Sequence, residues 1–301
     1  MSNMVQYGVW SNCCNACDFC LRKDRIPYSK EKMLRQLEGI KKNINYVDWV
    51  NQFSYGVSLL GGELYYITDP DLQESFLELI DIIIEKVLKV SPNRDVKYST
   101  VTNGLYDPTF LFKVIDKIKD AVGMEHVDIN FSYDLKYRYK TEEHRKLCLE
   151  NIQKFRDRYN YRVGVQMILT QYVIDMFNSG EFNLDKFLNE DLSGCFLAFL
   201  YPHKIQTGKV LTDFNFKRGD FLKFILKLRD SHPDMFKSFV ESTKNSSTFK
   251  YTGYLSKRGH YKQQPMLSDG KEVINPNCGH SILYQCYADS DKCMLCDLNA
   301  I

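Results

Sequence analysis

The chain has 301 residues, of which 44% are hydrophobic and 14% aromatic, and this is enough to bury one large core. Its formal net charge of +2 gives no reason to expect a nucleic-acid or membrane partner from overall charge. The start of the chain, MSNMVQYGVW, lacks a basic segment followed by an apolar one, so we expect no signal peptide and a cytoplasmic protein.

Six runs rich in β-branched and aromatic residues predict strands, and five segments with helical periodicity lie between them. The predicted strands are 5–10, 55–60, 96–102, 127–133, 161–170 and 195–201. The predicted helices are 30–53, 71–90, 109–122, 141–159 and 171–189, and charged residues in 71–90 indicate an amphipathic helix rather than a membrane span. This alternation is typical of an α/β fold with a parallel sheet. No dinucleotide-type glycine fingerprint follows the first strand, so the alternation of strands and helices favours a partial (βα)6 TIM-like barrel over a doubly wound sheet.

The pattern changes after Pro202, where a helix-like stretch at 218–229 is followed by a polar segment, 241–277, with little periodicity. We therefore predict a barrel domain over residues 1–235 and a small C-terminal cysteine-rich extension over residues 236–301.

Eight of the ten cysteines fall in two tight clusters, which favours metal binding over disulfides. The first cluster follows the first predicted strand and contains Cys13, Cys14, Cys17 and Cys20. Thiolates this close on a loop suit an iron–sulfur cluster. Two sets of three ligands are possible. One is Cys14, Cys17 and Cys20, and the other is Cys13, Cys17 and Cys20. A zinc knuckle or buried thiols are the alternatives.

The set Cys13, Cys17 and Cys20, with Phe19 before the last cysteine, resembles the CxxxCxxC signature of the radical S-adenosylmethionine (SAM) superfamily. The resemblance implies a barrel of the radical SAM type and a [4Fe-4S] cluster on these three thiolates, with one iron left open for SAM. It also implies reductive cleavage of SAM to a 5'-deoxyadenosyl radical, which abstracts hydrogen from a substrate. An electron donor such as flavodoxin or ferredoxin is implied as partner.

The ends of the next strands carry further motifs similar to those of the superfamily. Gly61, Gly62 and Glu63 match a GGE motif, which implies binding of the SAM amino group. The other matches are Thr102 and Asn103 at the SAM pocket, Ser132 and Asp134 at the ribose hydroxyls, and Gln166 near the adenine and carboxylate. The plain alternatives are a glycine turn with a surface carboxylate at Glu63, an Asn-Gly turn at Asn103, and surface polar residues at the fourth strand end.

The second cysteine cluster contains Cys278, Cys286, Cys293 and Cys296, separated by gaps of seven, six and two residues. It loosely resembles a shortened SPASM or twitch extension, which implies a second, auxiliary [4Fe-4S] cluster. Tetrahedral zinc on the four thiolates is the rival interpretation. His280 is expected to be a surface histidine.

The sequence leaves the substrate open. The C-terminal extension suggests a peptide or protein, whereas residues 201–275 contain 14 Lys and Arg against 7 Asp and Glu, with interleaved tyrosines that suit a nucleotide or nucleic acid. We favour the peptide or protein. A non-catalytic iron–sulfur or zinc protein is the alternative from another class, although an electron carrier needs no receptor for an amino group at Glu63.

Overall fold

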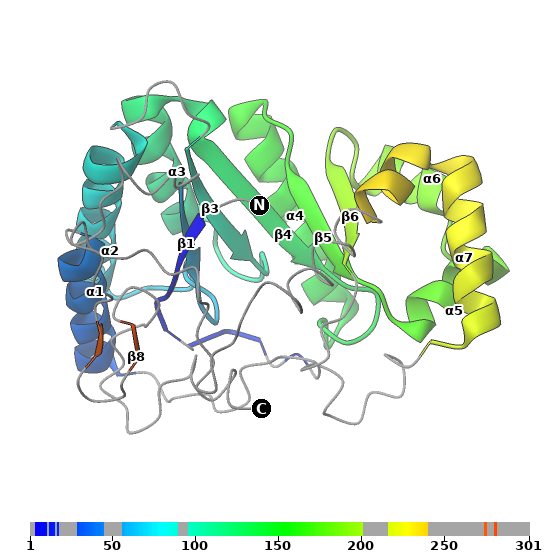
Figure 1. The fold of residues 1–301 in the computed structure, drawn as a ribbon, viewed down its shortest axis with the longest axis horizontal. Coiled ribbons are helices and arrows are strands. Elements are labelled where there is room, and N and C mark those ends of the chain that lie inside the picture. Colours follow the sequence, from blue (N-terminus) through cyan, green and yellow to red (C-terminus); the bar gives the residue numbers. More distant parts are fainter. Residues whose placement is uncertain are drawn as a thin grey trace.

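One parallel sheet dominates the structure. The computed structural model describes residues 4–10, 12–15, 17, 29–44, 56–89, 96–200, 216–239, 274–275 and 280–281. Within them the strands β1 to β6 pair in chain order, every pair parallel (Figure 1). The strands are β1 (Met4–Gly8), β2 (Gly56–Leu60), β3 (Lys97–Thr102), β4 (Val127–Tyr133), β5 (Gly164–Ile168) and β6 (Phe196–Leu200). Parallel neighbours in chain order need a crossover at every step, so the predicted partial (βα)6 barrel is confirmed.

Helices provide these crossovers. They are α1 (Lys30–Ile44), α2 (Pro70–Ile83), α3 (Thr109–Val122), α4 (Glu142–Tyr159), α5 (Gln171–Ser179) and the short α6 (Leu184–Lys186), with α7 (Arg218–Ser231) after β6. π-helical turns Ile84–Leu88 and Phe187–Asp191 extend α2 and α6, and a 3-10 turn Met124–His126 precedes β4. Two short strands, β7 (Ile274–Asn275) and β8 (His280–Ser281), pair antiparallel. Among the described helices, none combines the length and apolar character that a bilayer crossing requires.

The predicted helix 171–189 is wrong as a single element. It ends at Ser179, because Gly180 adopts a left-handed conformation with φ of 87° that closes the last turn. The next helical segment starts anew at Asn183, whose Oδ1 accepts from the N–H of Lys186 at 2.9 Å. The helical spacing of apolar residues continues from α5 into α6, so the apolar pattern did not indicate the break between them. The predicted helix 30–53 is confirmed as far as Ile44, and its remaining residues lie outside the described part of the chain.

The two faces of the sheet differ in chemistry. Along β4, Val127, Ile129, Phe131 and Tyr133 are buried, and the intervening Asp128, Asn130 and Ser132 are half-buried. The Phe131 ring meets Phe155 of α4 edge to face, with 6.0 Å between ring centroids. The apolar face therefore packs under the helices, and the polar face turns away from them.

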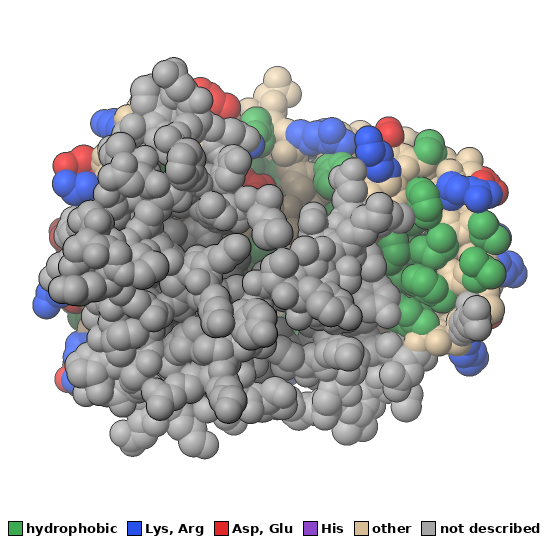
Figure 2. Space-filling view, viewed as in Figure 1, with side chains coloured by type: hydrophobic (Ala, Val, Ile, Leu, Met, Phe, Trp, Pro, Cys, Tyr) green, Lys and Arg blue, Asp and Glu red, His purple; other side chains and the backbone are tan. Residues whose placement is uncertain are grey.

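Helix α7 lies at one end of the molecule, beside α5 (Figure 1). Its Phe224 is fully buried and meets Phe177 of α5 with 5.1 Å between ring centroids. Figure 2 shows hydrophobic side chains gathered at this end, and Leu222 and Leu226 of α7 are 56% and 40% exposed. Burial on one side thus anchors α7 to the barrel, while its outer side also presents apolar groups.

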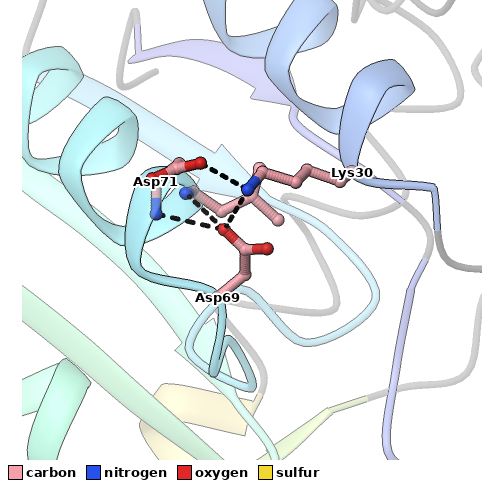
Figure 3. Close-up of polar contacts among 4 residues, drawn as sticks. Lys30, Asp69 and Asp71 are labelled. Atoms are coloured by element: carbon pink, nitrogen blue, oxygen red, sulfur yellow. Dashed lines mark hydrogen bonds and ion pairs between the residues drawn. The ribbon is translucent and has the colours of Figure 1, made fainter.

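Asp69 joins the starts of two helices (Figure 3). Its Oδ1 accepts from the N–H groups of Asp71 and Leu72 at 3.0 and 3.3 Å, which caps the N-terminus of α2. The Lys30 ammonium, at the start of α1, lies 3.1 Å from the same oxygen and also contacts Asp71. The Asp69 carboxylate therefore both caps α2 and forms an ion pair with Lys30 of α1.

The cap and the ion pair at Asp69 can be separated by two substitutions. We expect Asp69→Ala to lower Tm by about 2–4 °C, because two N–H groups of the first turn lose their acceptor. Asp69→Asn keeps an acceptor and removes only the partly exposed ion pair with Lys30, which keeps its second partner Asp71, so its Tm should stay within about 1 °C of the wild type. Thermal unfolding followed by circular dichroism compares them. Equal losses in both variants would assign the stability to the ion pair instead.

Candidate functional site

The segments after β1 and β2 lie against each other at the carboxyl edge of the sheet. The N–H of Gly62 donates to the carbonyl of Trp10 at 2.8 Å, and the N–H of Glu63 donates to the carbonyl of Asn12 at 2.8 Å. At Gly61 a Cβ would fall 2.2 Å from a methyl carbon of Leu64, so a side chain does not fit there without a shift. The lack of a side chain at Gly61 thus leaves room for Leu64 and for the Trp10 carbonyl, which lies 3.1 Å from the position that a Cβ would take.

Glu63 is a buried carboxylate that joins this pair of segments to the end of β3. It is 1% exposed, so the alternative of a surface carboxylate is wrong. Its oxygens accept from the Thr102 hydroxyl at 2.9 Å and from the N–H of Asn103 at 2.7 Å. Burial raises the pKa of Glu63 to about 7, although these hydrogen bonds act in the opposite direction. The site therefore holds a carboxyl that a nearby cation would help to ionise.

Asn103 connects the end of β3 to the cysteines. An Asn-Gly turn is present: Gly104 has a φ of 66°, and the N–H of Leu105 donates to Asn103 Oδ1 at 2.8 Å. The same Asn103 side chain also reaches across, because its Nδ2 lies 3.5 Å from both Cys13 Sγ and Cys14 Sγ. The turn therefore positions an amide donor at the thiols.

The cysteine loop is held by Asn15, which is buried. Its backbone N–H donates to Cys13 Sγ at 3.4 Å, and its Nδ2 donates to Cys17 Sγ at 3.3 Å. Cys14 is exposed, whereas Cys13 and Cys17 are partly buried. One asparagine thus contacts two of the three predicted ligands, Cys13 and Cys17.

Several predicted site residues lie outside the described part of the chain. These are Phe19, Cys20, Cys278, Cys286, Cys293 and Cys296. Within the described residues, no three Cys, His, Asp or Glu side chains are grouped so that they could hold a metal ion by themselves. A site on Cys13 and Cys17 therefore depends on a third ligand such as Cys20.

Asp134 forms the turn that follows β4. Its Oδ1 accepts from the N–H groups of Lys136 and Arg138, at 2.7 and 3.2 Å, and from the N–H of Tyr137. Its Oδ2 is buried and has no hydrogen-bond partner among the described residues. Burial raises the pKa of Asp134, and the backbone hydrogen bonds oppose this rise. One oxygen therefore shapes the turn, and the other is a buried acceptor that the hydrogen bonds of the turn do not use.

Ser132 and Gln166 are direct neighbours on β4 and β5, and both are half-buried. Partners in a parallel pair point to the same face, so the two side chains share the polar face of the sheet. The Ser132 carbonyl also accepts from the Tyr139 hydroxyl at 3.3 Å.

Two residues at the site were not predicted from the sequence, Asn15 and Arg138. The Arg138 guanidinium Nη1 lies 3.6 Å from Cys17 Sγ, and the Arg138 carbonyl accepts from Asn15 Nδ2 at 2.8 Å. The position of Asn15 between the cysteines was a usable signal. Arg138 had none, because 121 residues separate it from Cys17 and only the fold brings the two together.

No family model and no curated protein matches the chain. Among solved structures, SuiB of Streptococcus suis aligns over 76% of this chain and 46% of its own, with 13% identity and a TM-score of 0.44. Native anSMEcpe with bound AdoMet aligns over 84% of this chain and 65% of its own, with 18% identity and a TM-score of 0.43. The chain thus spans less than two thirds of the length of either protein.

Proposed function

We propose that the chain is a radical SAM enzyme in which Cys13, Cys17 and Cys20 bind a [4Fe-4S] cluster. The observation that carries this proposal is the meeting of the cysteine loop, the GGE segment and Asn103 around the buried Glu63 carboxylate. These motifs come from three different strand ends, and their sequence resemblance alone did not require them to touch. Active sites of barrel enzymes gather at this edge.

The residues present fit such a cluster. Cys13 and Cys17 face N–H donors from Asn15, Asn103 and Arg138, at 3.3 to 3.6 Å. Donors of this kind stabilise the thiolate, which is the form that binds iron, and hydrogen bonds to the sulfurs are a usual feature of iron–sulfur sites. When bound, the cluster would supply the electron for reductive cleavage of SAM.

The protein's own groups then bind and orient SAM. Glu63 accepts from its amino group, and Gly61 and Gly62, the two residues before it, match the part of the GGE motif whose backbone lies near SAM. The buried Oδ2 of Asp134, which has no hydrogen-bond partner among the described residues, accepts from a ribose hydroxyl. Ser132, Gln166 and Thr102 complete the pocket, with Ser132 and Gln166 on the polar face.

Reconstitution of the wild-type chain tests this function. After anaerobic loading with iron and sulfide, and with dithionite as reductant, we expect SAM to be converted to 5'-deoxyadenosine. If Cys278, Cys286, Cys293 and Cys296 hold a second [4Fe-4S] cluster, iron analysis should give about seven to eight irons per chain. About four irons with one zinc would assign structural zinc to that segment. A chain that binds iron but leaves SAM intact would instead be a non-catalytic metal protein.

The substrate is proposed to be a peptide or protein, with a nucleotide or nucleic acid as the alternative, and the electron donor a flavodoxin or ferredoxin. Because the C-terminal extension motivates the first substrate class, a zinc result would weaken it. The basic stretch at 201–275 motivates the second.

A further inference from the structure

Arg138 contacts the cysteine loop through both its side chain and its backbone carbonyl. Its guanidinium Nη1 lies 3.6 Å from Cys17 Sγ, and its carbonyl accepts from Asn15 Nδ2 at 2.8 Å. The same Nδ2 donates to Cys17 Sγ at 3.3 Å. Asn15 thus binds the loop after β4 and the sulfur of Cys17 at once, so that the cation and the thiol stay together.

The turn behind Arg138 restricts it further. The N–H groups of Lys136 and Arg138 both donate to Asp134 Oδ1, and Asp134 is itself buried. A residue at the end of such a turn has little backbone freedom, so its side chain starts from a defined place. An arginine carries its charge at every accessible pH. The geometry therefore places a permanent positive charge beside one predicted cluster ligand.

We propose that Arg138 raises the reduction potential of the cluster that Cys17 helps to bind, and that Asn15 is the positioning residue that holds Arg138 there. This inference rests on the proposed function. Gaining one electron makes a cluster more negative, so a nearby positive charge stabilises the reduced form. Hydrogen bonds to the ligand sulfurs act in the same direction. The effect is to let a moderate electron donor reduce the cluster.

The test is a redox titration of the reconstituted full chain with dithionite, followed by electron paramagnetic resonance, in which the signal that Cys17→Ala lacks identifies this cluster. We expect Arg138→Gln to bind the same amount of iron and to be about tenfold harder to reduce, a midpoint about 59 mV more negative for one electron. Arg138→Lys keeps a charge but loses the planar donor geometry, so its midpoint should lie between that of the wild type and that of Arg138→Gln. Asn15→Ala should lower the midpoint as well, and because Asn15 acts in part through Arg138, the double variant Asn15→Ala/Arg138→Gln should be lowered by less than the sum of the two single shifts.

Arg158→Gln is the matched control, because it removes the same charge from the opposite end of α4, where Arg158 pairs with Asp116 at 2.6 Å. Its midpoint should equal that of the wild type. If Arg138→Gln has the midpoint of the wild type, the inference is overturned. If Arg138→Gln binds no cluster, Asn15→Ala decides instead, and a wild-type midpoint in that variant overturns the inference. Loss of the cluster from both would make these residues necessary for assembly and overturn it too. A wild-type chain that takes up no cluster contradicts the proposed function itself.

Discussion

Cys13→Ala and Cys17→Ala should each lose the cluster and all formation of 5'-deoxyadenosine, whereas Cys14→Ala should keep most of both. The structure gives a reason for this choice between neighbouring thiols. Asn15 donates to the sulfurs of Cys13 and Cys17, whereas Cys14 is the exposed thiol of the three. Removing one of three thiolate ligands leaves two, which is too few to hold a [4Fe-4S] cluster.

The measurements are iron and sulfide content, the absorbance of the reconstituted protein and the yield of 5'-deoxyadenosine from SAM. Cys195→Ala is a suitable control, since Cys195 packs against the core near the start of β6 and no described contact joins it to the cysteine loop. An inactive Cys14→Ala beside an active Cys13→Ala would reverse the assignment and make Cys14, Cys17 and Cys20 the ligands.

The order of strands and helices could be predicted because each element has its own local pattern. Buried residues alternate along β4, and Thr141, where the predicted helix begins, caps α4 with its hydroxyl accepting from the N–H of His144. The break after Ser179 was missed because the prediction followed the apolar spacing, which continues there. The local signals were Gly180, which turns left-handed and ends α5, and Asn183, which caps the next helical turn.

The candidate site could be predicted in part. Glycines, cysteines and acids at fixed spacing identified the loops that carry it. The spacing of these residues in the sequence did not indicate which of their side chains contact one another. Glu63 is tied to Asn103 across 40 residues of chain, and Arg138 reaches Cys17 across 121. Contacts at such separations are made by the strand order, so they follow from the fold and have no local signal.

Glu63→Gln should weaken SAM binding by about 10- to 150-fold, since a hydrogen bond to a charged group contributes about 1.5–3 kcal/mol. Glutamine has nearly the same volume and keeps one carbonyl oxygen, which can still accept from the Asn103 N–H or the Thr102 hydroxyl. Glu63→Ala would leave both donors buried and unsatisfied, so its effect on SAM binding would be mixed with a loss of folding stability. The glutamine variant therefore isolates the charge.

Equilibrium dialysis or calorimetry with the reconstituted, unreduced protein measures the affinity without turnover. Iron content should be unchanged in Glu63→Gln, because its carboxylate is not one of the proposed ligands. Glu78→Gln is the matched control, since Glu78 pairs with Lys41 between α2 and α1 and is exposed. If Glu63→Gln binds SAM as tightly as this control while losing thermal stability, then the carboxylate serves to join the ends of β2 and β3, and the amino group of SAM must be received elsewhere.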